Sequence, residues 1–264
     1  IAEGRRAGGW FGLSDERWGA YAGWRDFWQQ YPGELEAADG VLHLHLWSSR
    51  GGSVLDFTPS VILGDEYPGD RIFYDRFYSG GLDRWTQAYG VGKTHNVWIN
   101  FFAHGLPHGT AGGREEAGSL TRATLNMPVL ALASPEWNTA TEAFGRVHPE
   151  DRERFPELEA ALDALLHRKR WMQERFEQYG WIDYGDAYYR RNSDQVLWRR
   201  WASMFYGWPN VAPLLYLRSG RRDAWDYHRI NTRHIIDIDI GHLESAEFGK
   251  RRGGRYGGNG GIVH

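Results

Sequence analysis

The sequence predicts an α+β chain in which a β-rich first part is followed by a helical second part. Apolar and polar residues alternate in runs between residues 33 and 102, whereas apolar residues beyond about residue 128 follow helical spacing. Between them, His104 to Ala117 is dense in glycine and suits neither element, so we expect a loop or linker there. We therefore predict two domains, 1–120 and 121–264.

In the first part, a hairpin and a later strand have the clearest patterns. Leucine and histidine alternate over residues 42–46, directly after an Asp39-Gly40 turn, and residues 97–101 alternate in the same way. His43 and His45 project to the same side of their strand and could ligate a metal ion. No third ligand is predicted nearby, so a solvated sheet face is the favoured interpretation.

The run Gly92-Lys93-Thr94 resembles the end of a phosphate-binding loop. However, Gln87 stands where that motif needs glycine, and a strand pattern follows instead of a helix. Nucleotide binding is excluded on these grounds.

Four helices are predicted in the second part. The first begins at Pro156 and ends at Gly180, and the second is capped by Ser193-Asp194, carries Leu197 to Phe205 and ends by Pro209. A shorter helix covers 211–218, and a polar helix follows Gly220. Helices joined by short loops are what a helical toroid or bundle requires.

The polar helix contains the densest group of residues suited to chemistry. Tyr227, Asn231 and His234 lie at positions i, i+4 and i+7, so they share one helix face. Unpaired polar groups are costly to bury, and we therefore expect this face to line a wet cleft. A hydrogen-bonded interface between packed helices stays open as the alternative.

Composition narrows the function classes. The net charge of -3 gives no uniform positive field, so nucleic acid is not an expected partner, and no apolar stretch approaches the roughly 20 residues that span a bilayer. The absence of cysteine excludes disulfides and thiolate chemistry. Aromatic residues make up 15% of the chain, an excess that suits carbohydrate ligands even though most such rings are expected in the core.

The ends of the chain favour a piece of a longer protein. It begins at Ile1 without a signal-peptide pattern, and it ends just after a glycine cluster. The sequence leaves the compartment open, with secretion or the periplasm favoured over the cytoplasm, and it does not indicate an oligomeric state.

Four segments resemble a known family. They are Arg25–Pro32 with Leu46-Trp47, the run Gly90-Val91-Gly92-Lys93-Thr94-His95, the run Tyr179–Asp186, and Arg233–His242. Together they are similar to the exo-rhamnogalacturonan lyase (YetA-like) family of polysaccharide lyases. The resemblance implies part of a central β-sandwich followed by the first helices of an α/α toroid, and a carbon-oxygen lyase acting on an acidic polysaccharide such as rhamnogalacturonan.

Cleavage of a uronic-acid glycoside by β-elimination needs three roles: neutralising the carboxylate, removing the C5 proton and protonating the departing O4. The catalytic candidates are His234 or Tyr227 as base and acid, with Asn231, Arg233 and His242. The substrate-binding candidates are Arg229, His228, Trp181, Asp183 and Asp186. No cofactor is required. Asp237 and Asp239 could hold a divalent cation such as calcium, although a structural role for these carboxylates is favoured.

Two other functions stay open. A toroid glycoside hydrolase acting on uronides would use paired carboxylates, for which Asp183, Asp186, Asp237 and Asp239 are available. A non-catalytic carbohydrate-binding fragment would use the aromatic residues alone.

Overall fold

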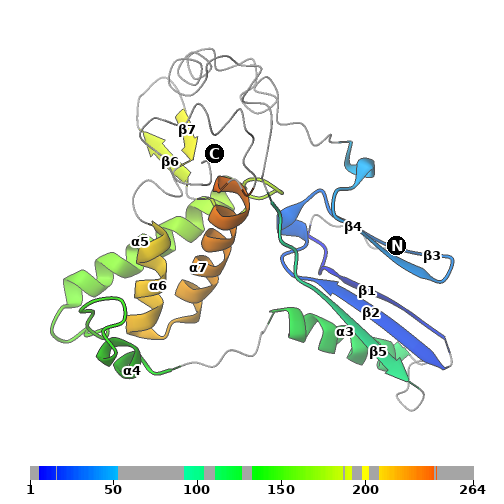
Figure 1. The fold of residues 1–264 in the computed structure, drawn as a ribbon, viewed down its shortest axis with the longest axis horizontal. Helices are drawn as coiled ribbons and strands as arrows, with labels where there is room; N and C mark the ends of the chain where they lie inside the picture. Colours follow the sequence, from blue (N-terminus) through cyan, green and yellow to red (C-terminus); the bar gives the residue numbers. More distant parts are fainter. Residues whose placement is uncertain are drawn as a thin grey trace. The chain divides into compact units, whose positions relative to one another are not determined.

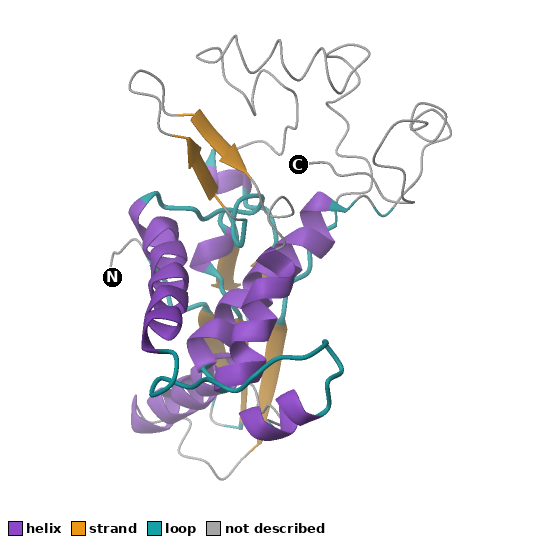
Figure 2. Ribbon diagram, turned by 90° about the vertical axis from the view of Figure 1, so that its left-hand side faces the viewer, coloured by secondary structure: helices purple, strands orange, loops and turns teal. Residues whose placement is uncertain are grey.

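The computed structural model describes residues 6–15, 17–52, 92–103, 111–126, 133–186, 188–191, 198–201, 208–240 and 242, and the grey trace in Figures 1 and 2 marks the rest. The chain divides into two compact units. The first unit comprises residues 1–46 and 94–235, and the second comprises 47–93 and 236–264. All β-strands and α-helices named below lie within the first unit. The 3₁₀ helix Ser49–Gly51 lies in the second unit.

The first unit contains a three-stranded antiparallel sheet with the order β1-β2-β5. The strands are β1 (Trp10–Ser14), β2 (Trp18–Trp24) and β5 (Val97–Ala103), so the strand predicted at 97–101 is confirmed. Helix α3 (Ala111–Asn126) packs on one face of this sheet. Gly23 permits the close approach, since a Cβ there would lie 2.2 Å from Leu125 Cδ1.

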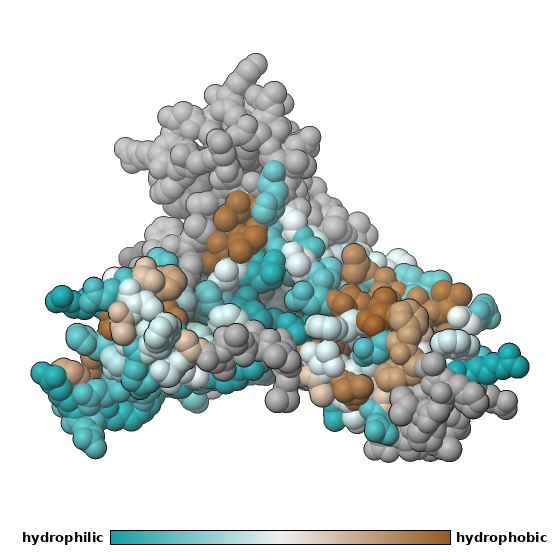
Figure 3. All heavy atoms as spheres, turned by 60° about the horizontal axis from the view of Figure 1, so that its bottom comes forward, coloured by the Kyte–Doolittle hydropathy of each residue, from teal (hydrophilic) through white to brown (hydrophobic). Residues whose placement is uncertain are grey.

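The opposite face of this sheet is apolar, and part of it is exposed. Ile99 and Phe101 share that face with Trp18 because side chains alternate along a strand, and their exposed fractions are 55%, 77% and 62%. The brown areas of Figure 3 lie mainly over the part of the surface formed by the sheet and α3, while the helical part is largely teal.

A separate hairpin consists of β3 (Glu34–Ala38) and β4 (Val41–His45). Asp39 and Gly40 connect the strands with φ of 52° and 77°, the left-handed values that a two-residue type I′ turn needs at both central positions. The predicted hairpin is confirmed. Two short 3₁₀ helices flank it, at Trp28–Gln30 and Ser49–Gly51.

Four α-helices follow: α4 (Pro135–Ala140), α5 (Pro156–Arg175), α6 (Trp208–Ser219) and α7 (Arg222–His234). The predicted helices at Pro156, at 211–218 and after Gly220 are confirmed. The tight turn between α6 and α7 uses Gly220, whose φ is +67°. A π-helical turn, Ile235–Asp239, follows α7.

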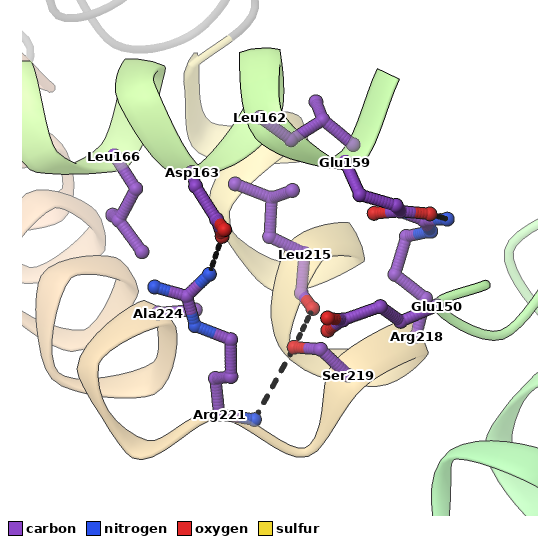
Figure 4. A pocket seen from close by; sticks show the side chains of 10 residues that line it. All are labelled: Glu150, Glu159, Leu162, Asp163, Leu166, Leu215, Arg218, Ser219, Arg221 and Ala224. Carbon is purple, nitrogen blue, oxygen red and sulfur yellow. Dashed lines mark hydrogen bonds and ion pairs between the residues drawn. The ribbon is translucent and has the colours of Figure 1, made fainter. Parts of the chain in front are cut away.

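Buried apolar side chains and ion pairs stabilise the packing of α5, α6 and α7 against one another. Leu166, Ala212, Ala224 and Tyr227 form a buried cluster. Beside it, Figure 4 shows a small cavity lined by ion pairs between the helices. Glu159 on α5 is buried and accepts two hydrogen bonds from Arg218 at 2.6 and 2.8 Å, and Arg221 pairs with Asp163.

Two predictions of secondary structure are wrong. Residues 111–117 are helical in α3 rather than part of a linker, because the run Arg114-Glu115-Glu116-Ala117 consists of good helix formers and the helix docks on the sheet. Residues 198–201 form strand β7 (Trp198–Trp201), which pairs with β6 (Tyr188–Arg191), and not a helix. Pro209 accordingly lies in the first turn of α6, where proline is tolerated.

The expected linker and the expected second helix are described only in part. Residues 104–110 of the expected linker and residues 192–197 of the expected helix lie outside the described residues. Helix α3 spans the predicted domain boundary between residues 120 and 121, and the division into domains stays a prediction. Within the described residues, no helix combines the length and the apolar character that crossing a membrane requires.

Candidate functional site

Helix α7 is amphipathic and buries the face that the sequence singles out. Its buried residues are Ala224, Tyr227, Ile230, Asn231 and His234, which lie three residues apart except for the adjacent Ile230 and Asn231. The exposed fractions of Tyr227, Asn231 and His234 are 6%, 0% and 1%. The three side chains do share a face, as predicted, but the expectation that this face lines a wet cleft is wrong, because the groups are packed inside the unit.

The segment Tyr179–Asp186, which follows α5, covers this face of α7. Gly185 makes the approach possible: its φ is +100°, and a Cβ there would lie 2.3 Å from the carbonyl oxygen of Ile230. Backbone therefore rests directly on backbone at this point. The Asn231 amide donates a hydrogen bond of 2.8 Å to the Gly185 carbonyl, which satisfies a buried donor and fixes the segment to the helix.

Next to Gly185, a carboxylate meets the imidazole of α7. Asp186 Oδ2 lies 3.5 Å from His234 Nε2, and both side chains are completely buried. A carboxylate in this position holds the orientation of the ring. Asp186 was predicted as a substrate ligand, but in the structure it faces the protein interior.

Two ionisable groups at this place have shifted pKa values. Burial and the neighbouring Arg168 lower the pKa of Lys169 on α5 to about 8, and the negative charge of Asp186 opposes this shift. Burial raises the pKa of Tyr227, and Asp186 adds to the effect, so the phenol keeps its proton at neutral pH. We refer to Lys169, Asp186, Tyr227, Asn231 and His234 as the α7 polar cluster.

An ion pair ties the other side of α7 to the end of β2. Arg229 donates to both carboxylate oxygens of Asp26, at 2.7 and 3.2 Å. Burial, together with the charge of Asp26, raises the pKa of Tyr184 well above its ordinary value. Arg229 was predicted to bind the substrate carboxylate, but its guanidinium forms an ion pair with the carboxylate of Asp26.

The remaining candidates of the first unit are at least partly exposed. Arg233 is exposed and donates to Thr94 Oγ1 at 3.3 Å. His228 is half-buried, with Nδ1 3.0 Å from Thr232 Oγ1, and burial lowers its pKa. Trp181 and Asp183 are partly exposed on the segment that covers α7.

Three candidates belong to the second unit, so the structure does not join them to the α7 polar cluster. His242 is exposed, with Nε2 2.6 Å from the carbonyl oxygen of Ile236. Asp237 is buried, and its carbonyl accepts a hydrogen bond of 2.8 Å from the Gly92 amide. The side chain of Asp239 lies outside the described residues.

Sequence reasoning missed Lys169, Asp26 and Gly185. A signal for Lys169 was present: it lies three residues from Leu166 and three from Met172, so a lysine interrupts the buried stripe of α5. Asp26 and Gly185 gave no local signal, because their partners on α7 are 203 and 46 residues away in sequence.

Comparison with known proteins identifies the family. Residues 127–260 match the PcRGLX-like protein C-terminal alpha/alpha toroid domain, a stretch that contains α4 to α7 and the whole α7 polar cluster. This chain belongs to the PcRGLX-like protein family. It is also 26% identical over 272 residues to the protein YetA of Bacillus subtilis (strain 168). That alignment covers 95% of this chain but 29% of YetA, so the chain spans less than a third of the length of this relative.

Membership of this family confirms part of the predicted fold and the broad family. The helical second part belongs to an α/α toroid domain, and the similarity to YetA confirms the broad family that the sequence motifs indicated.

Proposed function

We propose that the protein is a polysaccharide lyase that cleaves an acidic, uronic-acid-containing polysaccharide such as rhamnogalacturonan by β-elimination. One observation carries this proposal: the match to a family named for PcRGLX covers the region that holds the α7 polar cluster. The family description supports a carbohydrate-active protein related to rhamnogalacturonan lyases, and the residues of the cluster supply groups for proton transfer.

The residues proposed to contact the sugar are those that solvent reaches. Trp181 offers an aromatic ring for the apolar face of a sugar, and Asp183 offers acceptors for its hydroxyl groups. The exposed guanidinium of Arg233 matches a uronate carboxylate in a bidentate manner. Neutralising that carboxylate acidifies the C5 proton, which is the first requirement of the elimination.

Lys169 is the proposed base. Direct proton transfer by His234 or Tyr227 requires the substrate to reach side chains that are 1% and 6% exposed. Lys169, in contrast, is only partly buried, and its pKa of about 8 leaves a fraction of the amine neutral at physiological pH. A neutral amine can accept the C5 proton, and the electron pair of the C5–H bond then forms the C4–C5 double bond. O4 departs with the electron pair of the C4–O4 bond and takes up a proton from solvent.

His234, Asp186 and Asn231 are proposed positioning residues. The contacts of Asn231 with Gly185 and of His234 with Asp186 fix the segment that carries Trp181 and Asp183. The Asp186 carboxylate also acts on Lys169, because its negative charge stabilises the protonated amine that forms when the base takes up a proton.

The β-rich first part is proposed to be a portion of a β-sandwich in a longer protein. The apolar face of the β1-β2-β5 sheet, with Trp18, Ile99 and Phe101 exposed, has the character of a sheet surface that packs against a second sheet.

The test is an assay of the full-length protein that contains this chain, using rhamnogalacturonan and other uronate polymers. A lyase produces an unsaturated uronate that absorbs in the ultraviolet, whereas a hydrolase acting on intact polymer does not. K169M should lower the rate at least about a hundredfold, and E157Q, at an exposed position of α5, should not change it.

The same assay separates the proposed base from the alternative. If H234A loses at least about a hundredfold while K169M keeps most of the activity, His234 is the base and the assignment to Lys169 is wrong. A protein that binds the polymer but forms no unsaturated product contradicts the proposed function itself.

A further inference from the structure

The β3–β4 hairpin carries four metal-ligating side chains on one face. In the observed register Glu34 pairs with His45 and Glu36 pairs with His43. Directly paired residues of an antiparallel hairpin point to the same side, and residues two apart on one strand do so as well. The leucines at positions 35, 42 and 44 therefore occupy the other face, while the two carboxylates and two imidazoles gather on this one.

Three of these side chains converge on one point. A carboxylate oxygen of Glu34, a carboxylate oxygen of Glu36 and a ring nitrogen of His45 all lie within 4.8 Å of one another. His45 Nε2 is 3.5 Å from Glu36 Oε2. The ring of His43 stacks on that of His45, with centroids 5.9 Å apart and an angle of 18° between the planes, which supports the orientation of the ligating ring.

This donor set is suited to a divalent transition-metal ion. Imidazole nitrogen and carboxylate oxygen bind Zn²⁺ at about 2.0–2.2 Å, so ligand atoms around one ion lie about 3–4 Å apart. Small rotations of the two glutamate side chains bring the three atoms to that separation.

We propose that Glu34, Glu36 and His45 bind a zinc ion that ties β3 to β4, with water completing the coordination. Two ligands come from one strand and the third from the other, so the ion crosslinks a two-stranded hairpin, an element that is marginal by itself in water. The site is independent of the proposed lyase chemistry, which uses residues of α5, α7 and the segment between β6 and α5.

The test is zinc titration of the metal-free protein by isothermal calorimetry, followed by Co²⁺ substitution and visible absorption. We expect one equivalent of Zn²⁺ to bind and to raise the melting temperature. H45A and the double variant E34Q/E36Q should each weaken zinc binding at least about tenfold. Ca²⁺ should not compete, because imidazole is not a calcium ligand.

H167A, which removes an exposed histidine of α5, is the matched control and should leave zinc affinity unchanged. Circular dichroism spectra of H45A that match those of the parent protein show that any loss is local. Zinc binding that is as tight in H45A as in the parent assigns the ion to other histidines and overturns the proposal. The proposal also fails if the parent protein binds no zinc.

Discussion

Replacing Gly185 by alanine tests the packing of the Tyr179–Asp186 segment on α7. A Cβ at this position would lie 2.3 Å from the carbonyl oxygen of Ile230, whereas ordinary contacts begin at 3.4 Å. The segment must therefore move away by about 1 Å, on the scale of the contact distances of packed interiors. That movement breaks the hydrogen bond from Asn231 to the Gly185 carbonyl and leaves a buried amide without its acceptor.

The expected loss of stability follows from two contributions. Holding alanine at a φ of +100° costs about 1–3 kcal/mol, and an unsatisfied buried donor costs about 1–3 kcal/mol more. G185A should thus lower the free energy of unfolding by about 2–6 kcal/mol, a large fraction of the stability of an ordinary domain. Urea denaturation followed by tryptophan fluorescence measures this difference.

G145A is the matched control. Gly145 also has a positive φ, +82°, but nothing lies within 4 Å of the position that its Cβ would take. This variant should show the backbone cost alone, about 1–3 kcal/mol. If G185A and G145A agree to within about 0.5 kcal/mol, the spread expected of unrelated surface changes, the direct contact between the segment and α7 is refuted.

Three further perturbations have expected outcomes. D26N removes the charge that pairs with Arg229 but keeps the side-chain shape, so urea denaturation should show a loss of about 1–3 kcal/mol; equal stability would mean that the pair does not hold α7. E159Q should cost about 1–3 kcal/mol at pH 7. Arg218 lowers the pKa of Glu159 below its ordinary 4.5, so the difference in unfolding free energy between the parent protein and E159Q should shrink as the pH falls below 4.5. A difference that grows in acid would contradict a stabilising pair between Glu159 and Arg218. The rate of elimination should rise with pH, with an apparent pKa near that of Lys169, about 8. Because Arg168 lowers the pKa of Lys169, R168Q should move the pH profile of the rate to higher pH. An unchanged profile in R168Q would exclude Lys169 as the base.

Local patterns were sufficient to predict the elements whose partners are close in sequence. The Asp39-Gly40 turn predicts a two-residue hairpin, and its register places Glu34 opposite His45, so the proposed metal ligands could have been derived from the sequence as well. The spacing of Tyr227, Asn231 and His234 predicts their common face on α7. In each case the geometry of one helix or one hairpin fixes the relation between the residues.

The wrong predictions came from sequence patterns that fit more than one structure. Leu197 and Trp201 are four residues apart, which suits a helix, yet aromatic residues also favour strands, and the pairing of Trp198–Trp201 with β6 decides between the two. The polarity of the α7 face predicts contact with solvent, but the face is buried, and Asn231 and His234 contact Gly185 and Asp186, which are 46 and 48 residues away in sequence. Long-range contacts of this kind leave no trace in the local sequence.

The mass of the product formed from rhamnogalacturonan by the full-length protein tests the proposed β-elimination most directly. Elimination breaks the C4–O4 bond without adding water, so mass spectrometry should find a uronate-terminated product that is lighter than the hydrolysis product by one water molecule. If the reaction is run in ¹⁸O-labelled water, that product should contain no label. A product of the full hydrated mass that carries one labelled oxygen would show hydrolysis and contradict the lyase function.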